Sequence, residues 1–149
     1  MKMSPELEHA RRAMQPGAIS KEGFFGQDDR PLPDIISRDE EEMSRLGLDF
    51  DEVAARLTEL IRAGTSAYGS PVEYQAWRVT TEEARGSIPC PFRDGRFPKR
   101  ATTIVHTTSG ASLIVSDLAL HLLAAHHFLQ GKGAPFRLEP QAIKKVLGK

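Results

Sequence analysis

The stretch 118–129 (LALHLLAAHHFL) constrains the fold most, because it contains no Asp, Glu, Lys or Arg and would not remain exposed to water. Ser116 before it is a typical helix N-cap, and the glycines at 131 and 133 suit a C-terminal cap. The cap residues and the apolar run predict a helix over residues 117–129, and leucines recur on almost every side of it. We therefore expect a long apolar helix, deeply buried against a sheet.

Strand patterns precede this helix. Residues 72–80 alternate apolar and polar side chains, but the apolar face changes near Ala76, which predicts a bulge or a strand covered on both faces. Residues 102–107 and 111–115 predict a hairpin with Ser109-Gly110 as its turn. Between the strand pattern at 72–80 and this hairpin, Asp94-Gly95 is a strong turn signal, and the prolines at 89 and 91 exclude Cys90 from a central strand.

Two helices are predicted earlier in the chain. Residues 34–46 have apolar positions on one side, with Asp34 as a plausible cap, and residues 49–63 begin with a capping-box pattern. The short connection predicts a helical hairpin. The acidic run 39–42 cannot converge on one point of a helix, so we expect a solvated face there.

The fold class that follows is α+β: an N-terminal helical hairpin, a small and mostly antiparallel sheet over about 72–115, and the long apolar helix packed on the sheet. Residues 1–14 form an N-terminal arm with a short helix from Ser4, whose order the sequence does not decide. Residues 15–149 form a single domain, which ends in a basic helix over 139–147.

Composition narrows the class of protein. No run reaches the ~20 apolar residues of a membrane span, and one cysteine excludes a disulfide framework, so we expect a cytoplasmic protein of bacterial type. Residues 1–70 carry 9 Lys/Arg and 14 Asp/Glu, whereas the rest carries the opposite imbalance. The adjacent Phe24 and Phe25 in a long loop would anchor it to the core or to another chain. These features favour self-association, as a homodimer, or a protein partner.

The candidate site centres on Cys90 and His121, joined by some of His106, Asp117, His126 and His127. Thiolate and imidazole are ligands that zinc prefers. On an ideal helix, however, His121 and His126 point about 140° apart, so they converge only if the helix unwinds or two chains contribute. We therefore expect core and capping histidines and keep zinc as the alternative.

Two other functions are compatible with residues 85–100, namely cysteine catalysis and nucleic-acid binding. Cys90 with a histidine base would suit nucleophilic catalysis, although a small thiol in this segment also suits simple packing. The basic surface of Arg93, Arg96, Lys99 and Arg100, interleaved with Phe92 and Phe97, would suit single-stranded nucleic acid. The neutral chain as a whole argues against that partner.

The motif IPCPF, the threonine-rich hairpin and the segment SDLALHLLAAHHFLQGKGAPFRLEP together resemble a small bacterial family of uncharacterised cytoplasmic proteins. The earlier piece MQPGAISKEGFFGQDDRPLPDII fits the same resemblance, which spans the chain from about Met14. It implies one domain and brings no activity, cofactor or catalytic residue.

Because no catalytic motif stands out, the leading prediction is a non-enzymatic binding or protein-interaction domain. The alternatives are a metal- or cysteine-dependent enzyme centred on Cys90 and His121, and a nucleic-acid binder that uses residues 93–100.

Overall fold

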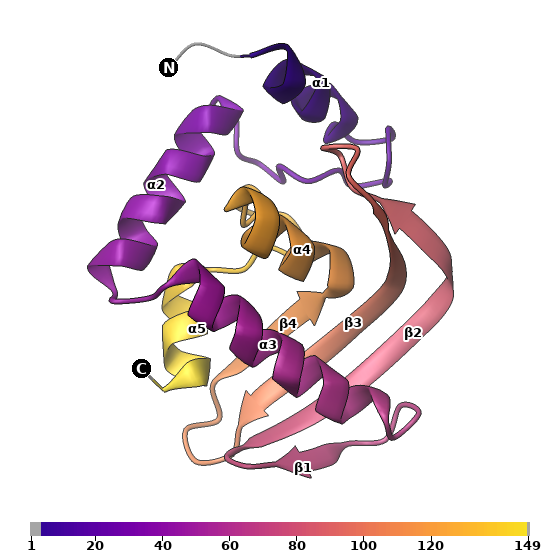
Figure 1. Cartoon of the computed structure of the whole chain (residues 1–149), viewed down its shortest axis with the longest axis vertical. Helices are drawn as coiled ribbons and strands as arrows, with labels where there is room; N and C mark the ends of the chain where they lie inside the picture. Colours follow the sequence, from indigo (N-terminus) through magenta and orange to yellow (C-terminus); the bar gives the residue numbers. More distant parts are fainter. Residues whose placement is uncertain (1–3, 149) are drawn as a thin grey trace.

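The computed structural model describes residues 4–148 and confirms the α+β class. Within these residues five helices accompany a four-stranded antiparallel sheet with the strand order β1-β2-β3-β4 (Figure 1). In chain order the elements are α1 (Pro5–Ala13), α2 (Leu32–Arg45), α3 (Phe50–Thr65), β1 (Val72–Tyr74), β2 (Trp77–Pro89), β3 (Arg96–His106), β4 (Ser112–Ser116), α4 (Asp117–His126) and α5 (Pro140–Leu147). No helix in the described part of the chain is long and apolar enough to cross a membrane.

The predicted helical hairpin is present as α2 and α3. Asp49 caps α3, because its carboxylate accepts a hydrogen bond from the Glu52 N–H at 2.9 Å. Helix α2 begins two residues earlier than predicted, with Pro31 in the N-cap position, so Asp34 lies in its first turn and is not the cap. The proline-rich entry is compatible with an early start, since proline suits the first turn of a helix.

The change of face near Ala76 proves to be a hairpin turn and not a bulge. Tyr74 of β1 pairs with Trp77 of β2, and Gln75 between them has a left-handed φ of 51°. The irregularity of β2 lies further on, between Glu83 and Ser87, where its register against β3 shifts. The alternation of apolar residues therefore located the irregularity near Ala76 correctly, but the predicted bulge is a turn between two strands.

One face of the sheet carries the main core. Val79, Ile104 and Val115 point from three neighbouring strands to this face and are fully buried. Helices α3, α4 and α5 pack over them (Figure 1). Alternate residues of the same strands point to the opposite face, and Ile114 is half exposed there. The sheet is therefore packed on one side, as is common for antiparallel sheets.

Helix α4 is shorter than predicted. It covers 10 residues and ends at His126, not at Leu129. His127 takes a left-handed φ of 53° as the C-cap, and the N–H of Phe128 bonds back to the Leu122 carbonyl at 3.1 Å. The ring of His127 is also held outside the helix, stacked on Phe50 with centroids 3.9 Å apart. A histidine therefore ends the helix where glycine was expected to do so.

A second cluster of buried apolar side chains lies beyond the end of β4. It joins Ala10 and Met14 from the N-terminal segment to Leu122 and Phe128. Helix α1 lies against this end of the molecule (Figure 1), and Ser4 caps it as predicted. Of the two adjacent phenylalanines that were expected to anchor the loop, Phe24 is buried in this same cluster and Phe25 packs edge-on against Phe128.

Candidate metal centre

The turn between β2 and β3 places Cys90 and Asp94 at the end of the sheet that lies beneath α1 (Figure 1). The turn is closed by hydrogen bonds of 2.9 Å from the Cys90 N–H to the Gly95 carbonyl and from the Arg93 N–H to the Cys90 carbonyl. Arg93 has a left-handed φ of 63°, which helps to reverse the chain. As a result Cys90 is buried, while Asp94 lies at the exposed rim above it.

Helix α4 brings His121 and His126 to the same turn. The Nε2 atom of His121 lies 2.9 Å from Asp94 Oδ1, and Nε2 of His126 lies 2.7 Å from Oδ2. The Cys90 Sγ atom is 4.0 Å from His126 Nε2. One ligand atom from each of these four side chains lies within 4.8 Å of the other three. The turn and the helix thus assemble a compact Cys-Asp-His-His cluster from one chain.

The expectation that His121 and His126 cannot converge on a regular helix is wrong. Helix α4 remains α-helical through His126, and the two rings lie 5.3 Å apart, edge to face. Ideal angles describe where the Cα–Cβ bonds point, whereas an imidazole extends well beyond the helix surface. The side chains therefore lean towards each other and meet over the turn at Asp94.

Two phenylalanines hold these imidazoles in place. Phe92 stacks on His126, with ring centroids 3.9 Å apart and planes 12° apart. Phe97 lies against His121 at 4.4 Å, tilted by 30°. The sequence suggested that both aromatic rings could stack on nucleic-acid bases, but each of them packs against a histidine. Stacking of this kind fixes ring orientation and excludes water from one side of each ring.

Electrostatics couple the cluster. Burial by itself raises the pKa of Asp94, but hydrogen bonds from Cys90, His121 and His126 outweigh it and hold that pKa well below its usual range. Burial, followed by the contact with Asp94, raises the pKa of Cys90 to about 12. The isolated thiol therefore stays protonated at neutral pH and is a poor nucleophile. A divalent cation is the kind of partner that would displace its proton.

The donor set fits zinc. Cys sulfur, His nitrogen and Asp oxygen are its usual ligands in proteins, and four of them fill a tetrahedron. With metal–ligand bonds of about 2.0–2.3 Å, neighbouring ligand atoms in a tetrahedron are about 3.3–3.6 Å apart. His121 and His126 contact different oxygens of Asp94, at 2.9 and 2.7 Å, and Cys90 Sγ lies 4.0 Å from His126 Nε2, so the present spacings are both shorter and longer than those of a tetrahedron. Side-chain rotations that bring the four ligand atoms, which now lie within 4.8 Å of one another, to the tetrahedral spacing would admit the ion.

Two residues of the predicted site lie elsewhere. His106 is at the opposite end of β3, where its Nδ1 contacts the N–H of Ser109 at 3.3 Å and its ring meets Trp77 edge-on. Asp117 begins α4 and forms an ion pair with Arg100 at 2.7 Å. His127 also lies outside the cluster and bonds to Glu40 at 2.7 Å.

The predicted basic surface is only partly free. Arg100 is paired with Asp117, and Arg96 donates to the Ser87 hydroxyl at 2.9 Å. Arg93 and Lys99 are exposed. The sequence did not identify Asp94, because the Asp-Gly pair was interpreted only as a turn. The sequence did contain a usable signal: a carboxylate four residues after the single cysteine, on the other side of a turn, which would place the two side chains close together.

Comparison of the chain with protein-family models, with curated protein sequences and with solved structures finds no match. The chemistry of the centre is therefore inferred from its own residues.

Proposed function

We propose that the protein binds one zinc ion through Cys90, Asp94, His121 and His126, and that the ion stabilises the fold and does not catalyse a reaction. The observation that carries this proposal is the convergence of four zinc-type ligand atoms, all within 4.8 Å, on one side of α4. The ion would fasten the turn at 90–95 to the helix, and with it the adjoining apolar cluster of the N-terminal segment.

A structural role is favoured over catalysis by the number of ligands. Structural zinc sites use four protein ligands, whereas catalytic sites keep one position for water or substrate. Here Asp94 occupies the position nearest to solvent, with its side chain 38% exposed, so a carboxylate stands where water would have to bind. This is consistent with a binding protein that is not an enzyme. The raised pKa of Cys90 likewise disfavours an enzyme that uses this thiol as a nucleophile.

Among residues 4–148 no specific contact favours the nucleic-acid alternative. Of its two aromatic residues, Phe92 stacks on His126 and Phe97 lies tilted against His121, and Arg100 is neutralised by Asp117. Self-association and a protein partner remain predictions. The pair Phe24–Phe25 does not supply their surface, because Phe24 is only 4% exposed and Phe25 packs on the protein's own core.

The direct test is elemental analysis of protein purified without chelator and then dialysed. We expect about one zinc per chain in the wild type, as in a closed four-ligand site, and none in Cys90→Ser or His126→Ala. The matched control is His127→Ala, which removes the neighbouring imidazole but no ligand and should keep its zinc. His106→Ala should keep it as well.

Two results would contradict the proposal. One is a wild type that holds no zinc and takes up none when zinc is added. The other is a His126→Ala variant that retains the full stoichiometry. Cobalt substitution adds information on geometry, because four-coordinate cobalt with a thiolate ligand gives intense visible absorption that the Cys90→Ser variant should lack.

A further inference from the structure

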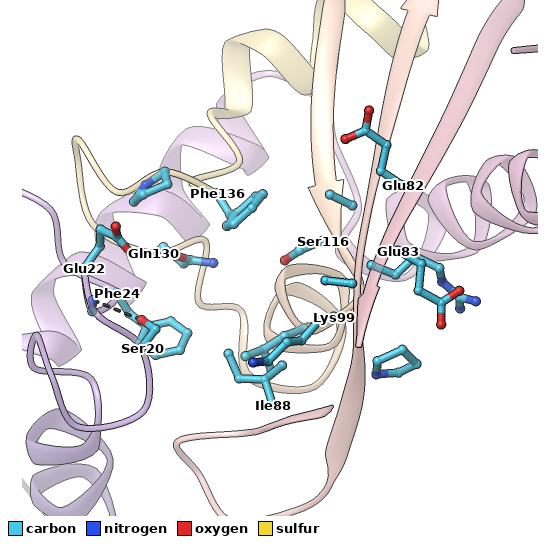
Figure 2. Close-up of a pocket in the computed structure, with 17 residues that line it drawn as sticks. Ser20, Glu22, Phe24, Glu82, Glu83, Ile88, Lys99, Ser116, Gln130 and Phe136 are labelled. Carbon is cyan, nitrogen blue, oxygen red and sulfur yellow. Dashed lines mark hydrogen bonds between the residues drawn. The ribbon is translucent and has the colours of Figure 1, made fainter. Parts of the chain in front are cut away.

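A cavity of about 620 Å³ lies beside the strand end where β4 passes into α4 (Figure 2). Apolar side chains form much of its wall, namely Phe24, Ile88, Pro98, Leu118, Pro135 and Phe136. The volume is typical of sites that hold a small organic molecule. The four residues of the metal centre do not line it, so its occupant is a separate question from zinc.

Gln130 is the unusual residue of this cavity. Its side chain is buried, with the residue only 4% exposed, yet its amide forms no hydrogen bond within residues 4–148. Other buried polar side chains do have partners: Thr81 and Thr102 bond to each other at 3.0 Å. Figure 2 shows the Gln130 amide among the lining side chains, near Phe24 and Phe136. Within residues 4–148 every fully buried side-chain nitrogen or oxygen has a hydrogen-bond partner, so the unpartnered amide of Gln130 is not sealed in the core and opens into the cavity, where a ligand can reach it.

The backbone of Gln130 is held in a conformation that residues other than glycine seldom adopt. Its φ is +73°, and its carbonyl accepts a hydrogen bond of 2.6 Å from the buried guanidinium of Arg137. Strained backbone of this kind is found disproportionately at binding sites, where the surrounding structure must maintain it. Arg137 therefore positions the residue whose amide faces the cavity.

The polar groups around the cavity favour an uncharged ligand. Lys99 and Arg100 are offset by Glu22, Glu82 and Glu83 on the same lining, and Arg100 is already paired with Asp117. Ser116 accepts the N–H of Ala119 through its hydroxyl oxygen at 3.0 Å, which leaves the hydroxyl hydrogen free to donate. The cavity thus offers an amide, a hydroxyl and apolar walls, with charges of both signs at its margin.

We propose that this cavity binds a neutral, ring-containing molecule that carries a carboxamide or lactam edge. Such an edge has an N–H and a C=O side by side, and it satisfies the donor and the acceptor of the Gln130 amide together. The ring packs against the phenylalanine and proline walls. A charged ligand would meet charges of both signs at the margin, one of them repulsive, and a purely apolar one would cover the Gln130 amide without satisfying it.

The test uses quinolin-2-one as the probe and N-methylquinolin-2-one as its matched control. The methyl group removes the lactam N–H and changes little else. Binding is followed by NMR titration of the full chain, including the side-chain NH₂ of Gln130. We expect saturable binding of quinolin-2-one, weakened at least about tenfold by N-methylation or by Gln130→Leu, as befits a lost buried hydrogen bond. In Gln130→Leu the two probes should bind alike.

Gln141→Leu serves as the control variant, because Gln141 lies on α5, contacts Glu42 and does not line the cavity. The probe comparison in the wild type keeps the test valid if Gln130→Leu fails to fold. Benzamide serves as a second probe, because it carries an open carboxamide in place of the lactam. The proposal is overturned if neither quinolin-2-one nor benzamide binds saturably up to about 10 mM, a range that includes weak small-molecule affinities. Equal binding of the two quinolinone probes to the wild type, or unchanged binding by folded Gln130→Leu, also overturns it. Zinc stoichiometry is independent of these outcomes.

Discussion

The guanidinium of Arg137 donates two hydrogen bonds to the carboxylate of Asp39, at 2.8 and 2.9 Å, across 98 positions of the chain. Both side chains are buried, 4% and 7% exposed. The same guanidinium also bonds to the Gln130 carbonyl and to Glu139. This pair ties α2 to the segment that follows α4.

Removing the Asp39 carboxylate should therefore destabilise the protein strongly. In Asp39→Ala the Arg137 charge remains buried without its main partner, which costs about 3–5 kcal/mol in comparable buried pairs. Urea unfolding measures the loss. The control is Glu41→Gln, which breaks an exposed pair with Arg38 at 3.7 Å and should change the free energy of unfolding by less than about 1 kcal/mol. Similar losses in the two variants would show that the buried pair has no special role.

Asp28 should make stability depend on pH. Hydrogen bonds from Arg30, and further ones from the N–H groups of Lys132 and Arg30, hold the pKa of Asp28 well below its usual range despite its burial. An aspartate in the unfolded chain titrates near pH ~3.9. Above that pH the stabilisation by folded Asp28 is fully present, and it is lost as the pH falls towards the lower folded pKa.

The comparison is therefore between Asp28→Asn and the wild type. At pH 6 the variant should be less stable by about 1–3 kcal/mol, the usual loss for hydrogen bonds to a charged group. At pH 2–3 the gap should narrow, because the wild type has lost part of the same contribution. The exposed Asp29→Asn is the control and should change stability at pH 6 by less than about 0.5 kcal/mol. A gap that stays constant or widens with acid would contradict the assignment.

Gly131 lies where two loops meet backbone to backbone. Its N–H bonds to the Phe24 carbonyl at 2.8 Å, and a Cβ at Gly131 would come 2.2 Å from the carbonyl oxygen of Phe25. Gly131→Ala should therefore force the loops apart and cost more than about 3 kcal/mol, at or above the upper end of the usual cost of overpacking, because the clashing atoms are backbone. In Gly86→Ala, where nothing lies within 4 Å, only the penalty for a φ of +92° should appear, about 1–2 kcal/mol. Thermal unfolding of both variants separates the clash from the conformational penalty, and equal midpoints would exclude the clash.

Local chemistry made much of the fold predictable. The caps at Ser4, Asp49 and Ser116 mark helix starts that the structure confirms, and the strand pairing follows the turns at Asp94-Gly95 and Ser109-Gly110. These signals act over a few residues and need no knowledge of the rest of the chain. The end of α4 was not predictable in this way, because it depends on His127 stacking against a phenylalanine from α3.

The same distinction applies to the site. Cys90, His121 and His126 were candidates by residue type, but their convergence depends on how a turn lies across a helix far along the chain. Asp94 was missed because its turn signal concealed its carboxylate. Asp39 was assigned to a solvated acidic face, yet its partner Arg137 lies 98 residues away and buries it. Charge pairing over such distances leaves no mark in local sequence.

Zinc should raise the stability of the folded chain in a way that depends on the cluster. A ligand that binds only the folded state, at a free concentration about 1,000 times its Kd, raises the free energy of unfolding by about 4 kcal/mol. For a chain of this length, that corresponds to a rise of about 10 °C in the thermal midpoint. Chelated wild type titrated with zinc should show this rise, and His126→Ala should not. His127→Ala should show the full rise even if its starting midpoint is lower, because it loses the contacts with Phe50 and Glu40 but no ligand. Equal rises in His126→Ala and His127→Ala would mean that zinc acts elsewhere on the protein.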